Sequence, residues 1–215
     1  MFITFEGIEG CGKTTQIKRL ENGLRRKNIP LMRTLEPGGT TIGHTIRRIL
    51  LDSNHKNLSP LAELILYEAD RAQHVEEVIK PALDKGQWVL CDRFCDATVA
   101  YQGFARGMDM VLIRTLNDAV TRGIRPDLTF LLDCPVEIGL ERARTRNRDH
   151  AQKGQDRFEQ ERLAFHRVVR RGYLELASKE DKRFVIIDAA LTEDRVEEEI
   201  FRVLTPYLVN NHYDI

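Results

Sequence analysis

Residues 7–15 read GIEGCGKTT, and they follow the short apolar run FITFE at positions 2–6. The pattern G-x4-G-K-T within this stretch fits a loop that wraps a polyphosphate. Such a loop points successive backbone N–H groups inward, and bulky side chains would block that approach. A helix that begins near Gly12 would add the positive end of its dipole. The stretch therefore predicts a nucleotide-binding loop between a strand and a helix, and a glycine-rich turn without a ligand is the less favoured alternative.

Two residues of this loop have specific predicted tasks. Lys13 would reach the β- and γ-phosphates of a bound nucleotide, and the hydroxyl of Thr14 would hold Mg²⁺. Glu9 is unexpected at this place, because a carboxylate repels phosphate. The predicted nucleotide contacts of the loop are Gly7, Ile8, Glu9, Gly10, Cys11, Gly12, Lys13, Thr14 and Thr15.

Length and composition limit the class of protein. The chain has 215 residues, which suits one domain with a sizeable core, and we expect a single domain over 1–215. Lys and Arg together number 33, as do Asp and Glu, so no general attraction to nucleic acid or membrane is predicted. No apolar run is long enough to span a bilayer, and no signal-peptide pattern is seen, so we expect a cytoplasmic protein. The four cysteines form no CxxC pair, which favours free thiols over a zinc site or disulfides.

Five short apolar runs alternate with helix-like sequence. They lie at 2–6, 31–36, 88–92, 128–133 and 184–188, and long helices are expected over 61–83, 156–178 and 193–208. Runs that are apolar throughout predict strands buried on both faces, and their alternation with helices predicts a parallel sheet. The expected fold is therefore α/β, with a three-layer, doubly wound, five-stranded parallel sheet flanked by helices. Ligands of such sheets gather beyond the carboxyl ends of the strands.

Asp92 and Arg93 end the third predicted strand. Asp92 could hold Mg²⁺ opposite the phosphate loop, and Arg93 could bind a phosphate through two parallel hydrogen bonds. In the alternative interpretation Asp92 caps the next helix and pairs with Arg93. Thr98, Tyr101 and Gln102 follow on one helical face and could read a base or a sugar, although a polar helix face is more often only solvated.

Tyr67, Arg71 and His74 repeat at helical spacing within 61–83. An aromatic ring beside a guanidinium suits a nucleobase, because the ring stacks on the base and the guanidinium donates hydrogen bonds to it. Spacing alone does not separate this interpretation from a cation–π pair on the surface.

Residues 142–157 read RARTRNRDHAQKGQDR. Arginines one helical turn apart repel one another unless an anion neutralises them. We therefore expect a flexible flap over 142–157 that closes over the nucleotide and stabilises the charge of the moving phosphoryl group. A solvated basic loop is the alternative. The flap arginines expected to serve catalysis are Arg144, Arg146 and Arg148.

With these clusters in place, the chain resembles the thymidylate kinase family over nearly its whole length. The matching segments are FEGIEGCGKTTQ, EPGGT, LYEADRAQH, DRFCDATVAYQG, GQDRFE and IDAALTEDRV. The resemblance implies the fold of the P-loop nucleoside monophosphate kinases and the reaction of ATP with dTMP to give ADP and dTDP, with Mg²⁺, in dTTP biosynthesis. It also implies a homodimer formed by helix packing, and the bacterial arrangement in which flap arginines serve catalysis because Gly10 stands where other members have arginine.

The resemblance also assigns residues to the acceptor dTMP. Glu9 would contact its sugar, which accounts for a carboxylate inside a phosphate loop. Tyr67 would stack on thymine and Arg71 would bond the base carbonyl, while Arg47 and Arg93 would hold the acceptor phosphate. The full set expected to bind dTMP is Glu9, Glu36, Pro37, Arg47, Tyr67, Arg71, Arg93, Thr98, Tyr101 and Gln102.

Further expectations from the resemblance concern the two nucleosides and the reacting groups. Thr98 and Gln102 would lie at the polar edge of the base, and Tyr101 would crowd the 2′ position of the sugar and favour deoxyribose. Ala189 and Leu191 would border the adenine of ATP. The catalytic set would be Lys13, Arg93, Arg144, Arg146 and Arg148.

Two points stay open at the level of sequence. One is the cis or trans state of the peptide bond between Glu36 and Pro37, where a tight turn favours cis. The other is the class of protein: a kinase for a different nucleoside monophosphate or a deoxynucleoside, or a nucleotide-operated switch, would share the phosphate loop. A guanine-specific switch needs an NKxD stretch, which this sequence lacks.

Overall fold

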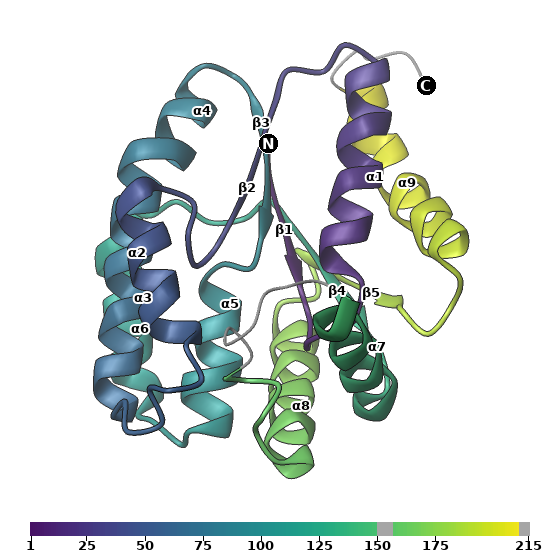
Figure 1. The fold of residues 1–215 in the computed structure, drawn as a ribbon. Helices are drawn as coiled ribbons and strands as arrows, with labels where there is room; N and C mark the ends of the chain where they lie inside the picture. Colours follow the sequence, from purple (N-terminus) through teal and green to yellow (C-terminus); the bar gives the residue numbers. More distant parts are fainter. Residues whose placement is uncertain (150–156, 211–215) are drawn as a thin grey trace.

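A five-stranded parallel sheet forms the centre of the computed structural model, which describes residues 1–149 and 157–210 (Figure 1). The strand order is β2-β3-β1-β4-β5, and all four neighbouring pairs are parallel. This arrangement confirms the doubly wound sheet expected from the sequence. The strands are β1 Phe2–Glu6, β2 Leu31–Leu35, β3 Trp88–Asp92, β4 Leu128–Asp133 and β5 Phe184–Asp188.

Helices cover both faces of the sheet. α1 and α9 lie side by side on one face, where Arg19 of α1 pairs with Asp194 of α9 at 2.8 Å, and α4 and α8 pack against the other face (Figure 1). The α-helices are α1 Lys13–Arg26, α2 Thr41–Leu51, α3 Pro60–His74, α4 Lys80–Asp84, α5 Cys95–Thr98, α6 Met110–Thr121, α7 Val136–Asp149, α8 Leu163–Lys179 and α9 Glu193–Asn210. Two wider turns of π-helix, η1 Val75–Ile79 and η2 Val99–Ala105, follow α3 and α5.

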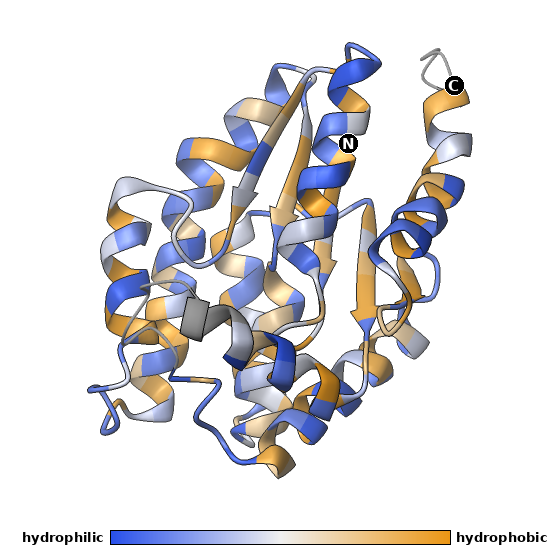
Figure 2. Ribbon diagram, turned by 45° about the vertical axis from the view of Figure 1, so that its right-hand side comes forward, coloured by the Kyte–Doolittle hydropathy of each residue, from blue (hydrophilic) through white to orange (hydrophobic). Residues whose placement is uncertain are grey.

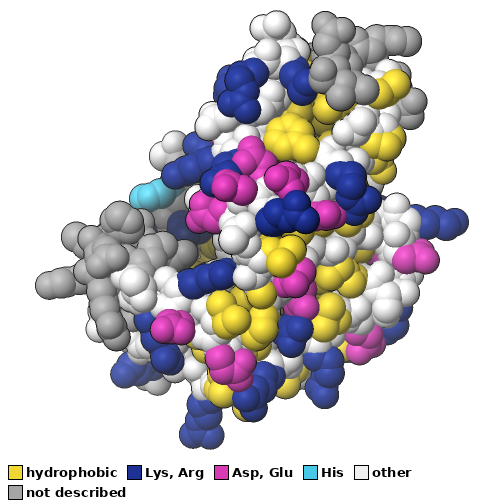
Figure 3. Space-filling model, turned by 90° about the vertical axis from the view of Figure 1, so that its right-hand side faces the viewer, with side chains coloured by type: hydrophobic (Ala, Val, Ile, Leu, Met, Phe, Trp, Pro, Cys, Tyr) yellow, Lys and Arg dark blue, Asp and Glu magenta, His cyan; other side chains and the backbone are white. Residues whose placement is uncertain are grey.

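The core lies between the sheet and its helices. The three central strands β1, β3 and β4 are buried along nearly their whole length, as expected. The expectation of burial on both faces is wrong for the edge strands β2 and β5, which each carry exposed residues because no strand of the described residues covers their outer side. In Figure 2 the strands are therefore largely orange, and the hydrophilic side chains gather on the helices and loops. Figure 3 shows cationic and anionic side chains interspersed on the face that carries α1 and α9. No helix among the described residues is long and apolar enough to cross a bilayer.

Several predicted boundaries need correction. The helix expected over 61–83 is interrupted by η1, and the helix expected over 156–178 begins only at Leu163, because residues 157–160 form a turn. The helix expected over 193–208 continues to Asn210, with Pro206 inside it. The peptide bond between Glu36 and Pro37 is cis, as expected. Of the predicted flap, residues 142–149 belong to α7, and residues 150–156 lie outside the described part of the chain.

The phosphate loop packs directly against the backbone of α7. Gly10 has a φ of +70°, and a Cβ atom at this position would lie 1.8 Å from the carbonyl oxygen of Gly139. A Cβ atom on Gly139 would in turn lie 2.5 Å from the carbonyl oxygen of Glu9. The two backbones touch without an intervening side chain, so glycine is required on both sides of the contact.

We expect Gly10→Ala to destabilise the protein more than Gly86→Ala. Both glycines have nearly the same positive φ, +70° and +72°, so both variants pay the left-handed strain of about 1–2 kcal/mol. Only the methyl group at position 10 meets backbone, whereas the Gly86 site is open, so overpacking should add about 1–3 kcal/mol to the first variant alone. Urea unfolding of the two variants measures the difference, and equal losses would contradict the close contact with Gly139.

Candidate active site

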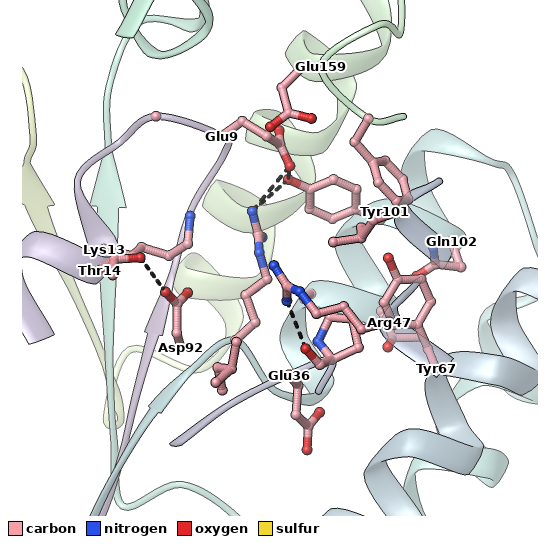
Figure 4. Close-up of a pocket in the computed structure, with 18 residues that line it drawn as sticks. Glu9, Lys13, Thr14, Glu36, Arg47, Tyr67, Asp92, Tyr101, Gln102 and Glu159 are labelled. Atoms are coloured by element: carbon pink, nitrogen blue, oxygen red, sulfur yellow. Dashed lines mark hydrogen bonds and ion pairs between the residues drawn. The ribbon is translucent and has the colours of Figure 1, made fainter. Parts of the chain in front are cut away.

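A cavity of about 210 Å³ opens at the carboxyl edge of the sheet, beside the phosphate loop. Figure 4 shows side chains pointing into it from the phosphate loop, the turn after β2, helix α3, the end of β3 and the turns of η2. It therefore lies where a doubly wound sheet is expected to bind ligands. The lining residues are Glu9, Gly10, Lys13, Thr14, Leu35, Glu36, Pro37, Arg47, Leu51, Tyr67, Asp92, Arg93, Ala97, Thr98, Tyr101, Gln102, Phe158 and Glu159.

The cavity brings together most residues that were expected to bind dTMP. Every residue of that set except Arg71 lines it, and so do both expected Mg²⁺ ligands, Thr14 and Asp92. Of the expected nucleotide contacts, Glu9, Gly10, Lys13 and Thr14 line the cavity. The remaining ones, which are not among its lining, are Gly7, Ile8, Cys11, Gly12, Thr15, Ala189 and Leu191.

The expected catalytic residues divide into two groups. Lys13 and Arg93 line the cavity. Arg144 lies exposed on α7, and the side chains of Arg146 and Arg148 lie outside what the structure describes. The catalytic use of the flap arginines therefore stays a prediction.

Thr14 and Asp92 meet at the end of the cavity next to the phosphate loop, as Figure 4 shows. The Thr14 hydroxyl donates a hydrogen bond to Asp92 Oδ2 at 2.9 Å. A hydroxyl and a carboxylate are hard oxygen ligands, and Mg²⁺ is commonly held by one or two such groups together with water and phosphate oxygens. No group of three or more His, Cys, Asp or Glu residues in the described ranges could hold a metal. The donor set thus fits Mg²⁺ that is completed by a nucleotide, and it does not fit a cage made only of protein side chains.

The side chain of Lys13 turns back and bonds the first residues of the phosphate loop. Its buried ammonium donates hydrogen bonds to the carbonyl oxygens of Gly7 at 3.0 Å and Ile8 at 2.8 Å, and Nζ lies 3.4 Å from Cys11 Sγ. The loop therefore keeps its curvature through a side chain that also lines the cavity.

Glu9 is the acceptor for side chains from three other elements. Oε1 accepts hydrogen bonds from the Tyr101 hydroxyl and from Arg93 Nη2 at 3.2 Å, and Oε2 lies 3.1 Å from His166 Nδ1. Burial raises the pKa of the Glu9 carboxyl, but the hydrogen bond from His166 and the charge of Arg93 more than offset it, so the pKa falls to about 2. Glu9 is thus a carboxylate at neutral pH, held rigidly at the border of the cavity.

Arg93 connects Glu9 to the core. Its φ of +70° is unusual for a residue other than glycine, and its backbone N–H donates to the carbonyl oxygen of Phe5 at 3.0 Å. Its guanidinium donates to the Tyr173 hydroxyl at 3.0 Å, and Tyr173 donates to Glu6 Oε2 at 2.7 Å. Burial, together with the charge of Asp96, raises the pKa of Glu6 to about 8.

The alternative in which Asp92 caps the following helix is wrong. The residue at that helix start is Phe94, without a side-chain cap, while Asp92 accepts from Thr14 and Arg93 pairs with Glu9.

Arg71 lies behind the cavity wall and is 1% exposed. A guanidinium has five N–H groups, and here each is matched by a protein acceptor. The acceptors are Glu36 Oε2, Glu68 Oε1, Asn117 Oδ1, the carbonyl oxygen of Phe94 and Thr98 Oγ1. A direct bond from Arg71 to a base carbonyl therefore requires that one of these bonds be exchanged. The alternative of a surface cation–π pair is also wrong, because the side chain is buried.

His74 is equally remote from the ligand space. It is fully buried between Glu36 Oε1, 2.8 Å from its Nδ1, and Thr34 Oγ1, 2.6 Å from its Nε2. Of the trio at helical spacing only Tyr67 lines the cavity. Arg71 and His74 instead hold Glu36, which does line it.

Sequence reasoning missed several residues that shape the site. His166, which contacts Glu9, and Glu63, which contacts Gln102, belong to helices whose local sequence gives no sign of a functional carboxylate or imidazole. Phe158 and Glu159 line the cavity directly after the arginine-rich segment. The sequence pointed to Phe158 and Glu159 only indirectly, because they are the last two residues of the matching segment GQDRFE.

Comparisons with known proteins agree with this site. A family model described as thymidylate kinase matches residues 5–200. A thymidylate kinase of Geotalea daltonii is 57% identical over 194 residues, which is 90% of this chain and 91% of the relative, and one of Pelobacter propionicus is 50% identical over 98% of this chain and 96% of the relative. The crystal structure of thymidylate kinase from Ehrlichia chaffeensis superposes with a TM-score of 0.76 at 34% identity, covering 95% of this chain and 98% of that one. The chain belongs to the thymidylate kinase family.

Proposed function

We propose that the cavity receives dTMP next to the phosphate tail of ATP, and that the enzyme transfers the γ-phosphoryl group directly between them. As a thymidylate kinase the chain phosphorylates dTMP to dTDP, a step in the supply of dTTP. The observation that carries the proposal is the convergence of Lys13, Thr14 and Asp92 with the expected dTMP residues in one cavity. Reacting groups held together in this way need no covalent enzyme intermediate.

At the nucleotide end, backbone N–H groups of residues 7–15 and the ammonium of Lys13 would bind the phosphates of ATP. Thr14 and Asp92 would hold Mg²⁺, which neutralises charge on the β- and γ-phosphates when it is bound. Ala189 and Leu191 would border the adenine, and Arg142 Nη1 ties α7 to this segment by donating to the carbonyl oxygen of Ala189 at 2.9 Å. Arg144, Arg146 and Arg148 would add positive charge over the transferring group.

At the acceptor end, Arg47 and Arg93 would bind the phosphate of dTMP. Arg47 Nη1 donates to the carbonyl oxygen of Pro37 at 2.7 Å, so the turn after β2 orients its guanidinium. Tyr67 would stack on thymine, and Glu9 would accept a hydrogen bond from the sugar. Arg47, Arg93, Tyr67 and Glu9 all line the cavity, which supports these roles.

Lys13→Ala should lower kcat by about a hundredfold or more, because the ammonium stabilises charge that develops on the phosphates. Lys18→Ala on the same helix is the matched control, since Lys18 is exposed and should leave turnover unchanged. ADP formation is measured with ATP and Mg²⁺ against a panel of dTMP, dCMP, UMP and thymidine.

Three outcomes of these assays would count against the proposal. Near-normal turnover of the Lys13 variant would remove the role of Lys13. A better rate with dCMP, UMP or thymidine than with dTMP would contradict the base assignment. ADP formation that needs no acceptor at all would favour a nucleotide-operated switch.

His166→Phe should weaken dTMP binding. It should also raise the pH below which the affinity for dTMP is lost. The hydrogen bond from His166 and the charge of Arg93 outweigh burial and lower the pKa of Glu9 to about 2, so in the native enzyme the carboxylate should be lost only as the pH falls toward that value. Without the hydrogen bond from His166 the pKa of Glu9 rises, and the loss of affinity begins at higher pH. His166→Asn, which can place an N–H near the position of Nδ1, should move the profile back toward the native one. The readout is the dissociation constant of dTMP between pH 4 and pH 8, and identical profiles for the native and Phe variants would refute this role.

We also propose a homodimer formed through helices α2, α3 and α6. These helices pack against one another along one side of the molecule (Figure 1). Six of the twelve large apolar side chains that are exposed in the described part of the chain lie on them. They are Ile42, Ile49, Leu61, Ile65, Val111 and Leu112. Exposed apolar surface of this kind is typical of a protein interface.

The single domain over 1–215, the cytoplasmic location and the lack of nucleic-acid or membrane partners stay predictions.

Ile65→Arg should convert the dimer into a monomer, because it buries an unpaired charge in the interface. Val209→Arg is a matched control: Ile65 is 51% exposed and Val209 is 48% exposed, but Val209 lies on α9. Light scattering after size exclusion gives the mass of each variant. A native enzyme that is monomeric at micromolar concentration, or a dimer that tolerates Ile65→Arg, would contradict this interface.

A further inference from the structure

Glu63 is a buried carboxylate that lies behind the cavity wall. It belongs to α3, is 1% exposed and does not line the cavity. Its Oε1 accepts from Gln102 Nε2 at 2.8 Å and from Arg106 Nε at 3.3 Å, and its Oε2 lies 2.7 Å from Arg157 Nη2. Donors from η2 and from the residue after η2, together with the charge of Arg157 in the turn before α8, thus converge on one carboxylate.

This contact decides which way the amide of Gln102 points. A carboxylate paired with two arginines only accepts hydrogen bonds, so the amide nitrogen of Gln102 must face Glu63. The carbonyl oxygen then faces away from Glu63. Gln102 lines the cavity. Its Oε1 accepts no hydrogen bond from a described residue, and it does not belong to the fully buried polar atoms that lack a partner. The cavity wall therefore presents a hydrogen-bond acceptor at this place.

Thr98, one helical turn earlier, presents a hydrogen-bond donor instead. Its Oγ1 accepts from Arg71 Nη2 at 3.0 Å, and a guanidinium can only donate. The proton of the Thr98 hydroxyl is therefore available for an acceptor in the cavity, which Thr98 also lines. Two groups behind the cavity wall therefore orient two neighbouring groups on it. Arg71 orients the Thr98 hydroxyl as a donor, and Glu63 orients Gln102 Oε1 as an acceptor.

The pair matches one kind of pyrimidine. Thymine and uracil carry an acceptor, O4, next to a donor, the N3–H group, whereas cytosine carries an amino donor at position 4 next to an acceptor at N3. We propose that Glu63 is a positioning residue that holds the Gln102 carbonyl toward N3–H and thereby makes the site select 4-oxo pyrimidines over cytosine. The inference rests on the proposed binding of the dTMP base against Thr98 and Gln102.

The direct test is Glu63→Gln. The substituted amide has the same shape but offers an N–H as well as an oxygen, so Gln102 can turn and present its own N–H to the base. The ratio of kcat/KM for dTMP to that for dCMP should fall by about tenfold or more, the scale of one mispaired buried hydrogen bond. The ratio for dTMP to dUMP should not change, because uracil has the same O4 and N3–H groups.

Two further variants serve as controls. Glu161 pairs with Arg106 at 2.7 Å but makes no bond to Gln102, so Glu161→Gln should leave the dTMP to dCMP ratio unchanged. Glu63→Asp keeps a group that only accepts, so it should keep the preference for dTMP even if its overall rate is lower.

Gln102→Leu separates failure of this inference from failure of the binding proposal. An unchanged dTMP to dCMP ratio in Gln102→Leu would show that the base does not contact Gln102. A lowered ratio in Gln102→Leu with an unchanged ratio in Glu63→Gln would overturn the role of Glu63. If both act as proposed, Glu63→Gln should have no further effect on the ratio in the Gln102→Leu background.

A measurement on the native enzyme keeps the inference testable if Glu63→Gln does not fold. In ¹⁵N-labelled enzyme one of the two side-chain NH₂ protons of Gln102 should be protected from exchange with water before dTMP is added, because it is hydrogen-bonded to Glu63. Addition of dTMP should leave this protection unchanged. Unprotected protons that become protected only with dTMP would show that the nitrogen faces the base, and the inference would be wrong.

Discussion

The site depends on the way Glu9 is held. This one carboxylate, within the loop that is expected to bind phosphate, accepts from η2 through Tyr101, from the end of β3 through Arg93 and from α8 through His166. Three regions that are distant in sequence, namely the phosphate loop, the end of β3 with η2, and α8, are thereby fixed around one point. Removal of any donor would leave a buried charge with fewer partners, which is costly, so the contacts stabilise one another. Glu9 also lines the cavity, so these contacts hold the phosphate loop, the end of β3, η2 and α8 in place around it.

Sequence reasoning recovered the elements whose signal is local. The phosphate loop, the positions of the five strands and the residues at the strand ends follow from spacing and from apolar runs, although only the three central strands are buried as expected. Helix boundaries were less certain where tertiary contacts compete with propensity. Residues 157–160 have a helical pattern, yet they form a turn, because Arg157 bonds the carbonyl oxygen of Leu50 and pairs with Glu63 while Phe158 fills the cavity wall.

The groups behind the wall could not be predicted for a different physical reason. Arg71, His74 and Glu63 are polar residues on a helix, and from spacing alone they are as consistent with a solvated face as with a buried network. Only the fold reveals that Arg71 uses all five of its N–H groups inside the protein. The resemblance named residues near the base, but it gave no information on which atom of an amide or hydroxyl faces the ligand. That orientation is a property of the second layer of side chains, and it requires coordinates.

The protonation of Glu6 has a thermodynamic consequence for the whole molecule. Its pKa is about 8 in the folded protein, compared with an ordinary value of 4.5, so between these values the native state holds a proton that the unfolded chain has released. Unfolding at pH 6 to 7 should then liberate this proton into the buffer, and the contribution of Glu6 to stability declines as the pH rises through that window. Glu9 acts in the opposite sense at lower pH, since its pKa of about 2 means that its contribution is lost as acid is added below pH 4.5. The two carboxyl groups, joined through Tyr173 and Arg93, thus make the folding equilibrium a proton-linked one on both sides of their ordinary pKa.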